Sequence, residues 1–378
     1  MRKMLKYVLV VLIVLLILAV ASALSSIKTQ IIPPTVIKNI NIGPSGGLPS
    51  LPEIAVAPNG KYAYATNDRL ATVSVISTSN NTVIDTIKVG NPNNTFPEGI
   101  AVAINGNYAY ISDALLSKVS ILSTLNDIII NNISIDGAHG NPGGVAVTPN
   151  GKYVYVAGKG VYVISTSNNT VVDRINITAY TSQIAFSPYG EYAYATNCGN
   201  NAVYVISTSN NTVVDTINIR SCPFGVAMAP NGKYLYVTNG TNSVTVISTP
   251  NNSVLGVIRV GYLPSGIVVS PDSKYAYVAT SAGVSIISTS NDSVVYSVNN
   301  IGSPEAVAVT PNGTEIYASY EYPSNFTPGV AVLSALKKGA AFVPLLNIIG
   351  IAAITVSILL LVLYDALSKK RHIKKDVS

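Results

Sequence analysis

Charged residues and histidine are scarce in this 378-residue sequence. Only 11% of the residues are charged, against about a quarter in typical soluble domains, and there are two histidines. No Walker loop occurs in the sequence, and His139 is the only histidine before the basic C-terminal cluster. Nucleophilic catalysis and nucleotide hydrolysis therefore have no support, and we assign no catalytic residue and expect no enzyme. A surface poor in carboxylates also predicts little loss of stability in acid.

The net charge of +6 is concentrated at the two ends of the chain. No basic stripe with interleaved aromatic residues lies between these ends, so we expect no nucleic-acid partner. Both basic clusters flank apolar segments, which indicates that they orient the chain in a membrane. The clustered residues are Arg2, Lys3, Lys6, Lys369, Lys370, Arg371, Lys374 and Lys375.

Two apolar segments predict the location of the protein. Residues 1–24 have the basic start, apolar run and Ala21-Ser22-Ala23 end of a signal peptide, although the run is long enough for an uncleaved signal anchor. Residues 342–365 are long enough to cross a hydrocarbon core of about 30 Å, and the basic residues 366–378 should stay cytoplasmic. We therefore predict a single-pass protein of the cell membrane whose central part is extracellular.

Glycosylation motifs agree with export. The sequence contains eleven Asn-x-Ser/Thr sequons, several of which arise because an Asn-Asn-Thr triplet recurs. We expect a glycoprotein, with these candidate acceptors: Asn80, Asn93, Asn132, Asn168, Asn176, Asn210, Asn239, Asn251, Asn291, Asn312 and Asn325.

A block of about 40 residues recurs seven times between Leu51 and Ala335. Each block contains four short runs rich in Val, Ile, Tyr and Thr, separated by Asn, Gly, Pro and Ser. This composition is typical of strands and tight turns, and the spacing is typical of four-stranded propeller blades. We predict an all-β, seven-bladed β-propeller over residues 35–335, with linkers at 25–34 and 336–341.

The ends of the repeat predict how the ring closes. The seventh block stops after its third strand, at Val330–Ser334. The segment Thr35–Gly43, upstream of the first block, matches Thr82–Gly90, the fourth strand of blade one. We therefore expect the N-terminal segment to supply the outer strand of blade seven, which removes the edges that a gap would expose.

The sequence resembles the YVTN family of β-propeller repeat proteins. The motif occurs as Tyr236-Val237-Thr238-Asn239 in the fifth block, and one-residue variants begin at Tyr64 and Tyr194. The resemblance covers about 300 residues. It implies an exported microbial protein of the kind found at archaeal cell surfaces and in surface layers, but it implies no activity, because the family shares no catalytic residues.

The strand order predicts two faces with different loops. The two chain ends should emerge on the face of the Pro-Asn-Gly turns, so we expect the opposite face to point away from the membrane. Aromatic residues in its varied loops either form a binding face or pack the loops onto the blades. These residues are Phe96, His139, Tyr180, Tyr262, Tyr320, Tyr322 and Phe326.

Two further groups fall on the same predicted face. Cys198 and Cys222 lie in loops of adjacent blades, where an exported protein favours a disulfide over two free thiols. Glu53, Glu98 and Glu305 come just before the innermost strands of blades one, two and seven. These carboxylates either hold Ca²⁺ or another hard cation at the channel mouth, or are solvated residues after proline. No other cofactor is indicated.

Three functions remain open at this stage. The first is a membrane-anchored recognition or scaffold module for envelope proteins or glycans. The second is an extracellular enzyme that uses a cation at the channel mouth. The third is a passive, glycosylated envelope spacer.

Overall fold

The computed structural model describes residues 31–44, 52–135, 142–322 and 327–338, together with residues 14, 17 and 358. The chain divides into two units, and Pro34–Ala335 form the larger one. The smaller unit contains a two-stranded sheet of β1 (Ile31–Ile32) and β29 (Lys337–Lys338). The predicted signal segment and the predicted transmembrane helix lie outside the described residues, apart from Val14, Ile17 and Ile358.

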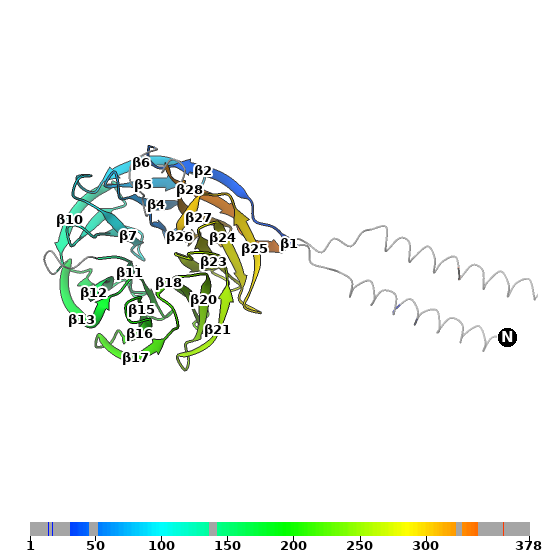
Figure 1. The fold of residues 1–378 in the computed structure, drawn as a ribbon. Coiled ribbons are helices and arrows are strands. Elements are labelled where there is room, and N and C mark those ends of the chain that lie inside the picture. The colour runs from blue at the N-terminus through cyan, green and yellow to red at the C-terminus, as the bar shows by residue number, and fades with distance from the viewer. Residues whose placement is uncertain are drawn as a thin grey trace, which may run out of the picture. The chain divides into compact units, whose positions relative to one another are not determined.

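The larger unit is a seven-bladed propeller, as the repeat predicts (Figure 1). In every blade the first strand is innermost and the fourth is outermost. Blade one comprises β3 (Ile54–Val56), β4 (Tyr62–Asn67), β5 (Thr72–Ser77) and β6 (Thr82–Lys88). Blade two comprises β7 (Pro97–Val102), β8 (Tyr108–Asp113), β9 (Lys118–Ser123) and β10 (Ile128–Ser134). Blade four comprises β14 (Ile184–Phe186), β15 (Tyr192–Asn197), β16 (Ala202–Ser207) and β17 (Thr212–Asn218). Blade five comprises β18 (Pro223–Met228), β19 (Tyr234–Asn239), β20 (Ser243–Ser248) and β21 (Ser253–Arg259). Blade six comprises β22 (Ile267–Val269), β23 (Tyr275–Thr280), β24 (Gly283–Ser288) and β25 (Ser293–Asn299).

Blade three has a short internal connection. It comprises β11 (Val145–Val147), β12 (Tyr153–Ser165) and β13 (Thr170–Tyr180). The first half of β12 pairs with β11 and its second half pairs with β13. This element therefore occupies the second and third strand positions of the other blades, and Gly160, at a φ of +87°, lies between its two halves.

The N-terminal strand closes the ring, as predicted. Blade seven comprises β26 (Ser303–Val309), β27 (Glu315–Tyr322), β28 (Thr327–Ser334) and β2 (Val36–Asn41). The outer strand β2 pairs antiparallel with β28, so that Ile40 is the partner of Val330 (Figure 1). The Ser334 N–H also donates to the Thr35 carbonyl at 2.9 Å. Both ends of the propeller unit therefore lie side by side at the end of the third strand of blade seven.

The core lies between neighbouring blades. One apolar cluster joins blade seven to blade one and includes Ile40, Ile54, Tyr317 and Val332. Equivalent clusters fill the five interfaces between successive blades from one to six. The second and third strands are buried on both faces because each blade is sandwiched between two others, which explains their continuous apolar runs.

The Thr of the YVTN motif hydrogen-bonds across the interface between blades. The Thr238 hydroxyl accepts the Gly225 N–H of its own blade at 2.7 Å and donates to the Ser265 carbonyl of the next blade at 2.8 Å. Thr196 and Ser112 make the same pair of bonds in blades four and two. A buried hydroxyl that satisfies a donor and an acceptor at once links the inner strands of adjacent blades.

Every outer strand contains a β-bulge at the same repeat position. Each pairs with its neighbour through a β-bulge, and the extra residue is always apolar and exposed. Bulges bend and twist an exposed edge, which discourages pairing with other strands. The seven bulge residues are Ile37, Ile84, Ile130, Val172, Val214, Leu255 and Val295.

Candidate functional site

The mouth of the central channel is formed by the residues that precede the innermost strands. Four blades have a glycine before or near the start of that strand, namely Gly99, Gly144, Gly225 and Gly266, because the backbone of the next blade approaches closely. A Cβ added at Gly99 would lie 2.4 Å from the Gly143 carbonyl oxygen, and one at Gly225 would lie 2.3 Å from that of Ser265. Blades one and four carry Glu53 and Gln183 at this position instead.

Glu53 and Gln183 meet although they come from blades one and four. The Gln183 Nε2 group donates to Glu53 Oε1 at 3.0 Å. The backbone N–H of each residue donates to a buried hydroxyl of its own blade, Thr66 or Thr196, at 2.9 and 3.0 Å. These bonds fix the two side chains at the start of β3 and β14, so that they form a polar bridge across the channel mouth.

The bridge lies beside two further carboxylates. Burial raises the pKa of Glu53 from an ordinary value of 4.5 to about 8, and the nearby charges of Glu98 and Glu305 add to the effect. Burial also raises the pKa of Glu98 to about 7, with a smaller contribution from Asp68. The pKa of Glu305 rises to about 7 through burial alone. The structure thus brings together all three carboxylates that the sequence placed at the channel mouth.

The described part of the chain contains no group of three or more Asp, Glu, His or Cys side chains close enough to hold a metal ion. Glu53 uses one oxygen for the bond from Gln183. Sequence reasoning missed Gln183, although it occupies the same repeat position as Glu53, where four of the other blades have glycine. This shared register is the signal that could have revealed it.

Exposed apolar side chains form an arc on the same face as the channel mouth. Tyr180 ends β13, Phe224 lies at the start of β18, and Tyr262 and Leu263 lie in the loop before β22. Tyr262 is 75% exposed, Leu263 64%, Tyr180 47% and Phe224 38%. Phe96, in the connection into blade two, is only partly exposed, and its N–H donates to Asp113 at 3.0 Å. Leu263 and Phe224 were not among the binding-face residues expected from the sequence.

One predicted binding-face residue is wrong and three others are not tested. Tyr320 is only 3% exposed because β27 extends through residue 322, and its ring packs over Gly302 and Gly329. Tyr322 ends β27, whereas His139 and Phe326 lie outside the described residues.

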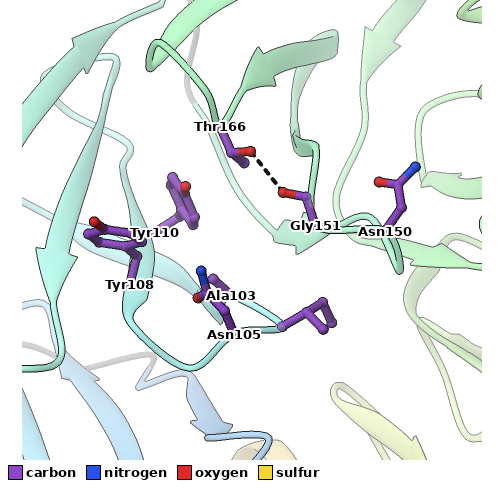
Figure 2. Close-up of a pocket in the computed structure, with 8 residues that line it drawn as sticks. Ala103, Asn105, Tyr108, Tyr110, Asn150, Gly151 and Thr166 are labelled. Atoms are coloured by element: carbon purple, nitrogen blue, oxygen red, sulfur yellow. Dashed lines mark hydrogen bonds between the residues drawn. The ribbon is translucent and has the colours of Figure 1, made fainter.

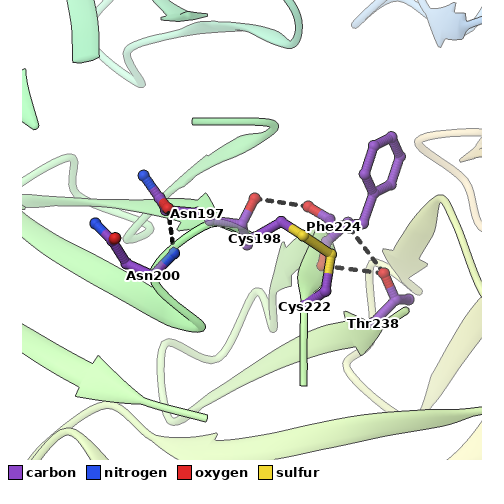
Figure 3. Close-up of a disulfide and its surroundings, with 8 residues drawn as sticks. Asn197, Cys198, Asn200, Cys222, Phe224 and Thr238 are labelled. Carbon is purple, nitrogen blue, oxygen red and sulfur yellow. Dashed lines mark hydrogen bonds between the residues drawn. A yellow bond between two sulfur atoms is a disulfide. The ribbon is translucent and has the colours of Figure 1, made fainter. Parts of the chain in front are cut away.

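Cys198 and Cys222 form a disulfide (Figure 3). Cys198 follows β15 of blade four and Cys222 precedes β18 of blade five, so the bond joins loops of adjacent blades. The Cys222 carbonyl also accepts the Gly240 N–H at 2.7 Å. This crosslink anchors the loop that presents Phe224 (Figure 3).

The structure separates the sequons by accessibility. Asn239 is only 4% exposed, and its amide donates to Ser243 and Thr245 at 3.0 and 2.9 Å. It therefore cannot accept a glycan in the folded state, and its assignment as an acceptor is wrong. Asn325 lies outside the described residues. The other nine predicted acceptors are exposed, namely Asn80, Asn93, Asn132, Asn168, Asn176, Asn210, Asn251, Asn291 and Asn312.

Comparisons with known proteins identify the fold and nothing finer. No protein-family model and no curated protein matches the sequence. A solved structure of the hydrazine synthase of Kuenenia stuttgartiensis is similar to this chain, with a TM-score of 0.67. The match is 23% identical and covers 79% of this chain and 98% of that one. At this identity the likeness shows a shared propeller architecture. No helix among the described residues is long and apolar enough to cross a membrane.

Proposed function

We propose that the protein is a recognition or scaffold module, anchored in the cell membrane by residues 342–365 and displayed outside the cell. The propeller would bind an envelope protein or a glycan through the face that carries the channel mouth. The apolar segments and the YVTN-like motifs support the location. The observation that carries the recognition role is the arc formed by Tyr180, Phe224, Tyr262 and Leu263.

Physical reasoning favours a binding role for this arc. A 75% exposed tyrosine next to a 64% exposed leucine leaves apolar surface in water, and aromatic residues on rigidly supported loops are enriched in binding hot spots. The Cys198–Cys222 disulfide restrains one of these loops and reduces the entropy lost on binding. The loops are therefore presented in a preorganised form.

Site-specific photo-crosslinking on intact cells tests the proposal. A benzoylphenylalanine at Tyr262 should crosslink to one envelope partner in stoichiometric amounts. Tyr189 is 89% exposed in a turn on the opposite face, so the same group there is the matched control. Equal crosslinking patterns from both positions, or none from Tyr262, would support a passive spacer instead. A rise in melting temperature that depends on Ca²⁺ would favour the alternative enzyme with a cation at the channel mouth.

A further inference from the structure

A cavity opens between blades two and three, on the face opposite the channel mouth. It has a volume of about 310 Å³, which lies in the range of small-molecule sites. Tyr108 and Tyr110 of β8 face Gly151 and Thr166 of blade three across it (Figure 2). Asn105 and Asn150, from the first turn of each blade, complete its polar rim.

The cavity coincides with a departure from the repeat. In four pairs of blades, the turn proline of one blade covers the turn glycine of the next. A Cβ added to the glycine would lie 3.0 to 3.4 Å from the proline ring, in the pairs Pro311–Gly60, Pro149–Gly190, Pro188–Gly232 and Pro271–Gly313. Gly106 is an exception, because the nearest atom to its added Cβ is Asn59 Nδ2 at 4.0 Å and not the ring of Pro58.

Blade two has Ile104 in place of this proline. The side chain of Ile104 is 51% exposed, and nothing lies within 4 Å of a Cβ added at Gly151. The uncovered glycine is therefore one wall of the cavity.

A second departure concerns the tyrosine of the motif. In blades three, five and seven the equivalent hydroxyl donates to a turn residue of the next blade, as Tyr155 does to Asn211. Among the described residues, the hydroxyls of Tyr110 and Tyr194 make no bond of this kind, and Tyr110, although only 2% exposed, is one of the residues that line the cavity. Burial raises its pKa, so this hydroxyl stays protonated and can donate at neutral pH.

The chemistry of the lining selects a neutral, polar ligand with one apolar face. No lining residue carries a formal charge. The Oδ1 atoms of Asn105 and Asn150 already accept the N–H groups of Asn107 and Lys152 at 3.0 Å. Their amide NH₂ groups are therefore left as donors. Tyr108, which is 37% exposed, offers an aromatic ring at the cavity edge.

We propose that this cavity binds one ring of a neutral saccharide. The C–H groups on one face of a pyranose are weakly positive and pack well on the negative face of an aromatic ring. The hydroxyl groups on its rim accept hydrogen bonds from the amides and from Tyr110. This proposal goes beyond the proposed recognition function, because the cavity is a second site on the face opposite the aromatic arc.

Direct binding to the full chain tests the proposal. The protein is purified in a detergent without a sugar headgroup, and saturation-transfer NMR measures binding of the methyl glycosides of glucose, galactose, mannose and N-acetylglucosamine. A ligand with about a dozen non-hydrogen atoms should bind with a Kd of about 1 mM. Lack of saturation transfer to all four glycosides at about 20 mM would overturn the proposal.

Three variants locate the binding. Tyr108→Ala should weaken it about tenfold through the lost aromatic face. Ile104→Pro introduces the turn proline of the other blades, whose ring should approach Gly151 as in the four covered pairs, and should weaken binding at least as much. Tyr153→Ala removes the equivalent tyrosine of blade three, which is 38% exposed, and should leave the Kd unchanged. Unaltered binding by Ile104→Pro, or an equal loss in Tyr153→Ala, would refute the assignment.

Two sources could supply the sugar ring, and a vesicle experiment distinguishes them. Stronger binding to phosphatidylcholine vesicles that contain a neutral glycolipid than to plain vesicles assigns the ring to a lipid headgroup. Equal binding to both, together with a measured Kd for a methyl glycoside, assigns it to a soluble or protein-linked glycan. These results do not depend on whether Tyr262 crosslinks to a partner, so the two proposals can fail separately.

Discussion

Replacing Glu53 with glutamine should stabilise the propeller, and the gain should grow as the pH rises. The Glu53 pKa is about 8 in the folded chain and 4.5 as its ordinary value. Between these values the folded state holds a proton that the unfolded state has released. The free energy of unfolding therefore falls as the pH rises through this window.

The magnitude follows from the two pKa values. The destabilisation caused by Glu53 is about 1 kcal/mol at pH 5 and about 4 kcal/mol at pH 8. Glutamine removes this effect, and its amide oxygen can still accept the bond from Gln183. For a propeller of about 300 residues, the difference of about 3 kcal/mol corresponds to a change of about 5 °C in Tm.

Thermal unfolding followed by circular dichroism at pH 5, 6, 7 and 8 is the appropriate assay. The Tm of Glu53→Gln should exceed that of the wild type by an amount that increases with pH. Glu191→Gln, which removes an exposed carboxylate far from the channel mouth, is the matched control. A Tm difference for Glu53→Gln that is constant from pH 5 to 8, or larger at pH 5, would refute the reasoning.

Three further outcomes are expected. Reducing the Cys198–Cys222 bond should lower the stability by about 3 kcal/mol, and mass spectrometry of the unreduced protein should find no alkylatable thiol. Thr238→Val should cost about 1 to 3 kcal/mol in a denaturant titration, because it leaves buried backbone groups of two blades unpaired; an unchanged midpoint would contradict the linking role of this hydroxyl. Glycopeptide mapping should find Asn210 occupied in a glycosylating host and Asn239 unoccupied, and a glycan on Asn239 would show that its buried environment is wrong.

The fold could be predicted from the sequence because every blade repeats the same local pattern. Turn residues, strand runs and the unmatched segment before the first block determine the number of blades and the closing strand. The same alignment placed Glu98 and Glu305 at equivalent repeat positions, with Glu53 one residue off that register, so that all three were expected at one end of the channel.

The errors occur where a side chain's environment depends on its neighbours in space. Tyr320 looks like a loop residue because Pro323 follows soon after it, yet Gly302 and Gly329 leave a space that its ring fills. Asn239 has the form of a glycosylation site, but its amide is used by Ser243 and Thr245. The bridge between Glu53 and Gln183 joins blades that are distant in the sequence. Only the shared repeat position of these two residues points to their pairing, and that signal appears only when whole blades are compared.

The closure by β2 has a consequence for how the protein is made. Its partner strand β28 lies almost at the other end of the propeller, since Thr35 and Ser334 are 299 residues apart. Joining such distant points costs about 5 kcal/mol in loop entropy for a flexible chain, so β2 and β28 can pair only after the intervening blades have assembled. The first strand of the propeller to be synthesised, β2, therefore pairs only after the last strand, β28, has been made. A truncated translation product cannot complete the circle, and it leaves unpaired strand edges exposed.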